Sequence, residues 1–218
     1  MFEREMKTLA AAMLVASLSL GTAEGLRAQS ALTQEQIDSL ARYGKVIIYN
    51  GPDPEGYGIL GYGGFVWDSA DGTNNLCTIG HVGNFDGPWK GLFENRGIGS
   101  DPAICMEVNG GIEDAPALST DGVQVGETVF MLNRELDAVV YFTVSEATES
   151  MAKLEALNPG SDRLPENGDS GTLAYKQNAA GDILAVGVYS GRDIVPNRDD
   201  PGNPRVIYNA ALFGEVDS

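Results

Sequence analysis

Two residues of this chain, a histidine and a serine, have the types and surroundings that nucleophilic chemistry needs. His81 is the only histidine, and it lies in the run Leu-Cys-Thr-Ile-Gly-His-Val at residues 76–82. Ser170 lies in Asn-Gly-Asp-Ser-Gly at residues 167–171. A serine hydroxyl is a poor nucleophile near pH 7 unless a base removes its proton, and imidazole has a suitable pKa for that task. A catalytic serine with a histidine base would therefore depend on His81.

The elements that must position these residues are short strands. Apolar and β-branched runs separated by turn residues predict strands at residues 45–49, 61–67, 75–79, 103–108, 128–132, 138–144, 172–175, 183–189 and 206–210. The 28 glycines and 10 prolines suit many turns and few helices. Residues 145–157 have the composition of a helix, with a loop or a divergent strand as alternatives. The pattern predicts an all-β sandwich or barrel.

Residues 1–30 have the pattern of a secretory signal peptide. From Met6 a basic start is followed by an apolar run too short to span a membrane comfortably, whereas Glu3 and Glu5 depart from the usual basic region and favour Met6 as the start. Small residues favour cleavage after Ser30, with residues 23–25 as a second site, and a membrane anchor is the alternative interpretation. Residues 31–44 then predict a short helix with Thr33 as its N-cap. We expect a secreted or periplasmic protein, in a compartment that permits disulfides.

The composition limits the possible partners. The chain has 218 residues and a formal net charge of -17, which would repel nucleic acid and anionic lipid, so we expect neither as a partner and no membrane association after signal cleavage. Two cysteines and one histidine cannot complete a four-ligand zinc site, and we expect no metal or cofactor. We expect a monomer.

The motifs around His81 and Ser170 together resemble those of the chymotrypsin-like serine proteases. Thr-Ile-Gly-His at residues 78–81 resembles the histidine box of that family, and Gly-Asp-Ser-Gly at residues 168–171 resembles its nucleophile loop. The order histidine, aspartate, serine is also the family's order. Either motif alone is weak evidence, whereas both in this order point to the family.

The flanking segments extend the resemblance to about residues 45–213. Residues 185–191 resemble the family's substrate-binding strand and residues 203–208 its closing strand. Residues 123–129 resemble the segment that opens the second barrel in compact bacterial proteases. The resemblance implies two antiparallel six-stranded β-barrels, the first at about residues 45–115 and the second at about residues 120–213. The active site would lie in the cleft between them.

Carried over to this chain, the resemblance implies acyl transfer. Ser170 would attack a peptide carbonyl, His81 would take and return its proton, and an aspartate would orient the imidazole. The backbone amides of Gly168 and Ser170 would form the oxyanion hole. Three further residues stand where the family binds substrate: Leu164, Ser190 and Gly191.

Two aspartates could be the acid, since each precedes an apolar run. Asp137 begins the more regular strand pattern, Asp-Ala-Val-Val-Tyr-Phe-Thr-Val. However, the chain between Asp137 and Ser170 is too short for most strands of a second barrel, whereas the chain from Asp101 is long enough. We favour Asp101 and keep Asp137 as the alternative acid. Pro102 after Asp101 departs from the usual family pattern.

The two cysteines flank the same candidates, since Cys77 precedes His81 and Cys105 follows Asp101 by the same interval. If Asp101 and His81 meet, their strands should be antiparallel neighbours, which would bring the thiols together. A cross-strand disulfide is then one possibility, and two buried thiols are the other.

These observations predict a secreted serine endopeptidase with a Ser-His-Asp triad. Two other functions fit the same residues. One is a protease-fold binding module that has lost catalysis, which the unusual Pro102 and Thr172 would favour. The other is an esterase that uses the same triad.

Overall fold

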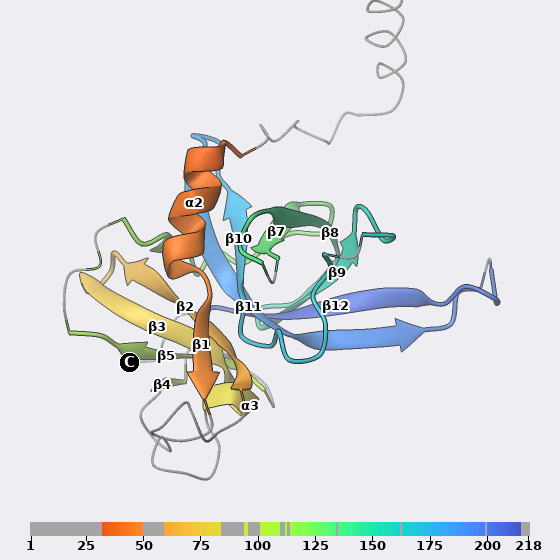
Figure 1. Ribbon diagram of the computed structural model, residues 1–218, viewed down its shortest axis with the longest axis horizontal. Coiled ribbons are helices and arrows are strands. Elements are labelled where there is room, and N and C mark those ends of the chain that lie inside the picture. The colour runs from red at the N-terminus through yellow and green to blue at the C-terminus, as the bar shows by residue number, and fades with distance from the viewer. Residues whose placement is uncertain are drawn as a thin grey trace, which may run out of the picture. The chain divides into compact units, whose positions relative to one another are not determined.

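The computed structural model describes residues 32–49, 59–83, 94–95, 101–109, 112, 114–133, 135–161, 163–198 and 200–214. The predicted signal peptide, residues 1–30, lies outside these residues. Within the described part of the chain one N-terminal helix precedes a series of strands (Figure 1). No helix in that part is long and apolar enough to cross a membrane.

Helix α2 (Gln34–Tyr43) begins at the expected cap. Thr33 accepts a hydrogen bond from the Gln36 amide, and the Gln36 side chain accepts one from the Thr33 amide, which completes a capping box. The helix ends at Gly44, whose amide donates to the Leu40 carbonyl. Leu40 is buried and belongs to the hydrophobic core. The helix therefore packs on the β-structure, and the chain enters the first strand immediately after it.

Six strands form the N-terminal half of the β-structure: β1 (Val46–Tyr49), β2 (Ile59–Asp68), β3 (Thr73–Ile79), β4 (Glu94–Asn95), β5 (Ala103–Glu107) and β6 (Ala117–Leu118). Strands β1, β2, β3, β5 and β4 pair antiparallel in that order. Strand β6 pairs with β2 in parallel.

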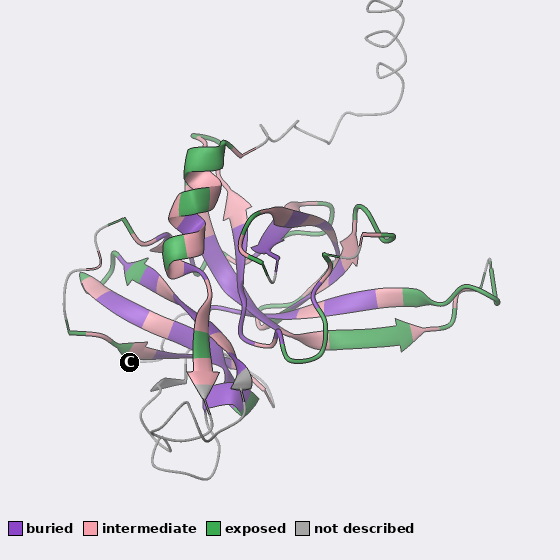
Figure 2. Ribbon diagram, viewed as in Figure 1, coloured by how far each residue is buried: buried purple, intermediate pink, exposed green. Residues whose placement is uncertain are grey.

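Six more strands form a closed antiparallel barrel: β7 (Thr128–Leu132), β8 (Val139–Ala147), β9 (Met151–Ala156), β10 (Leu173–Gln177), β11 (Ile183–Val195) and β12 (Arg205–Leu212). Each strand pairs with two others in the circular order β10, β7, β8, β9, β12 and β11, which returns to β10. Buried residues line these strands, whereas the far ends of β11 and β12 are exposed (Figure 2). The prediction of an all-β fold is confirmed.

The helix favoured for residues 145–157 is wrong. Strand β8 continues to Ala147, a turn follows, and β9 pairs back onto β8. Ala152 and Leu154 are buried while Met151 is exposed, so the side chains alternate with the period of a strand. Pairing on both edges and burial against the barrel core outweigh a composition that favours a helix.

Strand β6 joins the two halves through backbone hydrogen bonds. Besides pairing with β2, it runs parallel to β11, with Leu118 opposite Ala185. The Trp67 amide donates to the Pro116 carbonyl, and the Ser119 amide donates to the Ala185 carbonyl. The segment between the halves is therefore itself part of the sheet.

A disulfide joins the two strands that lead to His81 and Asp101. Cys77 of β3 lies opposite Cys105 of β5, with their Cα atoms 4.1 Å apart. Both residues are buried. The possibility of a cross-strand disulfide is confirmed, and that of two free thiols is wrong.

Candidate active site

His81 and Asp101 are joined by two hydrogen bonds. The ring atom Nδ1 of His81 lies 2.7 Å from Oδ2 of Asp101, and the His81 backbone amide donates to Oδ1 at 2.9 Å. A carboxylate oxygen can only accept, so Nδ1 carries a proton, and in the neutral ring the lone pair is therefore on Nε2. The His81 side chain is 47% exposed and that of Asp101 is 36% exposed, so the pair lies at the surface.

The backbone on either side fixes this pair. Strand β3 ends at Ile79 and runs directly into the single turn α3 (Gly80–Gly83), which carries His81. The Gly80 amide donates to the Pro102 carbonyl at 2.9 Å. A Cβ atom at Gly80 would lie 3.0 Å from Oδ1 of Asp101, so glycine allows the close approach. Pro102, unusual for the family, fits because it precedes the first residue of β5.

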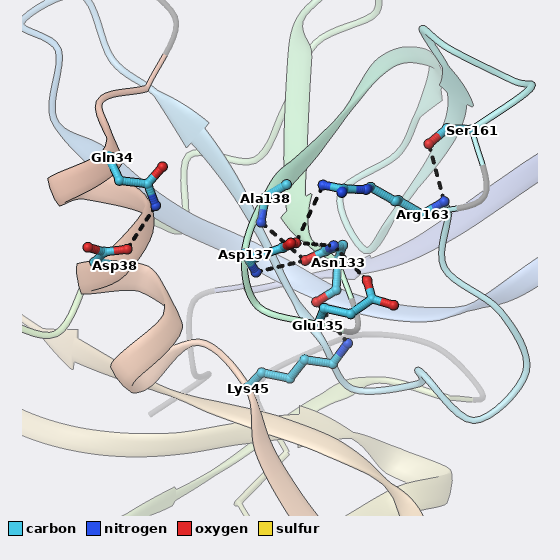
Figure 3. Close-up of polar contacts among 9 residues, drawn as sticks. All are labelled: Gln34, Asp38, Lys45, Asn133, Glu135, Asp137, Ala138, Ser161 and Arg163. Atoms are coloured by element: carbon cyan, nitrogen blue, oxygen red, sulfur yellow. Dashed lines mark hydrogen bonds and ion pairs between the residues drawn. The ribbon is translucent and has the colours of Figure 1, made fainter.

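Asp137 lies in a different environment. Its Oδ1 accepts a hydrogen bond from the side chain of Asn133 at 2.7 Å and pairs with Arg163 at 3.4 Å (Figure 3). The Asp137 amide donates to Asn133 in return. Asp137 is thus part of the turn between β7 and β8, with a side chain that is 58% exposed. Of the two candidate acids, Asp101 is the one that binds His81.

Ser170 lies in a tight turn, residues 166–172, which we call the nucleophile loop. The Asp169 amide donates to the Glu166 carbonyl, and Oδ2 of Asp169 accepts from the Glu166 amide at 2.9 Å. The Thr172 hydroxyl donates to the Asp169 carbonyl at 2.7 Å. Thr172 occupies a position where the family often has glycine, and this bond gives its hydroxyl a partner inside the loop.

The nucleophile loop packs against β2 beside the histidine turn. The Tyr62 amide donates to the Ser170 carbonyl at 2.8 Å. A Cβ atom at Gly61 would lie 2.6 Å from both the Ser170 carbonyl oxygen and Cγ2 of Val82. Since Val82 follows His81, the serine and the histidine turn flank the same glycine. The backbone of Ser170 and the histidine turn therefore lie on either side of Gly61, and the described residues show no hydrogen bond between the His81 ring and the Ser170 hydroxyl.

Gly168 and Ser170 carry the two amides that the sequence resemblance assigns to an oxyanion hole. Gly168 has φ of 93° and Gly171 has φ of 90°, conformations that glycine adopts without strain. The Gly171 amide, in contrast, is bonded to the Tyr189 carbonyl at 2.7 Å. Neither the Gly168 nor the Ser170 amide donates to an acceptor among the residues that the structure describes.

The three predicted substrate-binding residues lie around this loop. Ser190 and Gly191 are at a bulge in the β11–β12 pair, and Gly191 has φ of 154°. The Ser190 hydroxyl donates to the Asn209 carbonyl at 3.3 Å, so its proton is directed to β12. Leu164 is partly buried against the core of the barrel.

Burial also affects the pKa of Tyr189, whose backbone contacts the nucleophile loop. Tyr189 is 1% exposed, and its carbonyl accepts from the Gly171 amide. Desolvation by burial raises the pKa of Tyr189 well above its ordinary value, Arg192 opposes this, and the negative charges of Asp169 and Glu166 contribute to the rise.

Sequence reasoning missed Lys45, which contacts the nucleophile loop. Its Nζ lies 3.4 Å from Oδ1 of Asp169, and both side chains are almost fully buried. The available signal was a lysine at the start of an otherwise apolar strand, directly after a glycine that ends a helix. A buried lysine needs a partner, but the sequence does not say which carboxylate provides it.

A scan against protein-family models and a search of the curated proteins found no match. Solved structures of the NS6 protease from murine norovirus 1 are similar to this chain. One has 18% sequence identity and a TM-score of 0.49, and covers 72% of this chain and 88% of that protease. A second, of an inactive mutant with a C-terminal extension, has 18% identity and a TM-score of 0.48, with coverage of 72% and 91%. At these values the likeness carries no argument about the reaction, so the functional argument rests on the residues of this chain.

Proposed function

We propose that this chain is a secreted serine endopeptidase that cleaves polypeptides through an acyl-enzyme. The observation that carries the proposal is the pair of hydrogen bonds that His81 donates to Asp101, which leaves Nε2 of the neutral ring as a base near the nucleophile loop. The assignment of Asp101 as the acid of the triad, of Ser170 as the nucleophile and of Gly168 as part of the oxyanion hole is part of this proposal.

The reaction follows from these positions. Ser170 Oγ attacks the peptide carbonyl as its proton passes to Nε2 of His81. The negative charge on the carbonyl oxygen is stabilised by the amides of Gly168 and Ser170, a contribution of about 10²–10³ in rate for each donor. The imidazolium, stabilised by Asp101, then gives its proton to the leaving amine. Water releases the acyl group by the same steps in reverse order.

A fluorophosphonate probe tests the proposal, because it phosphonylates only an activated serine. Intact mass spectrometry of the wild-type protein should show one added group, located at Ser170 by peptide mapping. The variants Ser170→Ala and His81→Ala should show none over the same time. A wild-type protein that stays unlabelled would instead be a binding module. Labelling combined with turnover of esters but not of unfolded polypeptides would assign the chain as an esterase.

A further inference from the structure

Lys45 is buried at the junction between helix α2 and strand β1. Its side chain is 2% exposed and that of Asp169 is 5% exposed, with 3.4 Å between Nζ and Oδ1. Lysine and aspartate are rarely buried unless they are paired. The pair also joins two distant parts of the chain, since Asp169 immediately precedes Ser170.

The Lys45 ammonium contacts three parts of the fold. Besides Asp169, it donates to the Asn133 carbonyl at 3.4 Å, at the end of β7 (Figure 3). It also lies over the ring of Tyr62, 4.4 Å from the centroid. The amide of Tyr62 in turn donates to the Ser170 carbonyl. Lys45 therefore contacts the residue before the nucleophile and the residue that binds its carbonyl group.

The carboxylate of Asp169 binds both Lys45 and the backbone of the nucleophile loop. While Oδ1 faces Lys45, Oδ2 accepts from the Glu166 amide, so one carboxylate binds the lysine and closes the turn. That turn contains Gly168, one of the two amides assigned to the oxyanion hole. Rotation of the Asp169 side chain would break the bond to Glu166 and allow the Gly168 and Ser170 amides to diverge.

We propose that Lys45 is a positioning residue, which holds Asp169 so that the nucleophile loop keeps its reactive shape. The inference rests on the proposed function for its catalytic consequence. A buried ion pair commonly adds little net stability compared with apolar residues of similar volume, so its effect here is on orientation. The N-terminal helix then has a role in the active site, because it delivers Lys45 to the loop.

The packing of the helix end supports this role. A Cβ atom at Gly44 would lie 2.3 Å from the Tyr175 hydroxyl and 2.6 Å from the Leu40 carbonyl oxygen, so only glycine fits. Tyr175 belongs to β10, the strand that follows the nucleophile loop. The backbone beside Lys45 is thus packed tightly against the barrel.

The variant Lys45→Met tests the proposal, with Lys176→Met as a matched control. Lys176 is a partly buried lysine that donates to the Gly122 carbonyl at 2.6 Å. Two quantities are measured on the mature protein well below its melting temperature. One is the second-order rate of Ser170 labelling by a fluorophosphonate, and the other is hydrogen exchange of peptides that cover residues 163–172. The exchange measurement needs no activity.

We expect Lys45→Met to slow labelling by about 10- to 100-fold, the effect of a small misplacement of catalytic groups. We also expect faster exchange in the nucleophile loop, while Lys176→Met changes neither quantity. Labelling and exchange at wild-type rates in Lys45→Met would overturn the proposal, as would equal losses in both variants. If the wild type itself is not labelled, the proposed function fails, but the exchange data still test the contact between Lys45 and the loop.

A second variant covers the case in which Lys45→Met does not fold. Combining Lys45→Met with Asp169→Asn removes both charges and leaves no unpaired buried carboxylate. This double variant should fold and still label slowly, because the link between the helix and the loop is lost. Labelling at the wild-type rate would show that the pair does not position Ser170.

Discussion

Replacing Asp101 by asparagine tests the arrangement at the centre of the proposed mechanism. The two carboxylate oxygens of Asp101 accept separate bonds, one from the His81 ring and one from the His81 amide. Asparagine has only one acceptor oxygen. If that oxygen keeps the backbone bond, the amide NH₂ faces Nδ1, which must then accept, and the ring proton moves to Nε2. His81 can then no longer take the proton of Ser170.

The expected loss follows from this tautomer. Asp101→Asn should slow Ser170 labelling and peptide turnover by about 10⁴-fold near pH 7, which corresponds to about 5.5 kcal/mol of barrier. The free energy of unfolding should fall by only about 1 kcal/mol, because both contacts persist and a charge-assisted hydrogen bond at a partly exposed site becomes a neutral one. A large kinetic effect with a small effect on stability distinguishes orientation of the base from support of the fold.

The assay compares fluorophosphonate labelling of the wild type, Asp101→Asn and Asp137→Asn, with urea unfolding of each. Asp137→Asn is the matched control, since it makes the same chemical change in an aspartate that binds Asn133 and Arg163. It should label at close to the wild-type rate. If the labelling rate of Asp101→Asn fell less than tenfold, or if Asp137→Asn alone abolished labelling, the assignment of the acid would be refuted.

Three further predictions concern the scaffold. Replacing Cys77 and Cys105 together by alanine should lower the free energy of unfolding by about 3–4 kcal/mol in urea, since the disulfide closes a separation of 28 residues, while labelling in the cold persists. Tyr175→Phe removes a buried hydroxyl that has no hydrogen-bond partner among the described residues, and it should raise that free energy by about 1 kcal/mol. Burial raises the pKa of Tyr175 in the folded state, so the unfolded state loses the phenol proton first and the wild-type free energy of unfolding falls above about pH 10. Between pH 8 and 10.5 the free energy of unfolding of Tyr175→Phe should therefore fall less than that of the wild type. Gly171→Ala should abolish labelling, because the new Cβ would lie 1.8 Å from the Tyr62 carbonyl oxygen. Gly126 has the same φ of 90° but open space around it, so Gly126→Ala should lower the free energy of unfolding by only about 1 kcal/mol and leave labelling unchanged.

The parts of the candidate site that were predictable from sequence are those encoded in short contiguous runs. His81 and Ser170 stand out because each lies in a local motif with its own turn residues. The contact between Asp101 and His81 was predictable because strands require a minimum length of chain, which argued against Asp137. The disulfide was expected only as a possibility, since it depended on that contact.

The parts that were not predictable depend on tertiary contacts. Residues 145–157 contain residues that favour helices, and only pairing with β8 and β12 makes them a strand. The contact between Lys45 and Asp169 spans 124 positions in the chain, so no local pattern could indicate it. The role of Asn133, 1% exposed and bonded to Asp137 and Lys45, likewise appears only once the strands are assembled.

The two-residue strand β6 has a consequence for how the molecule moves. A connection between two halves that share an active site is usually a hinge, and opening at that hinge sets the rate of many enzymes. Here the connection forms backbone hydrogen bonds to β2 on one side and to β11 on the other. Opening would break those bonds. The protein should therefore melt in a single cooperative transition, and it should receive its substrate across a rigid surface without domain closure.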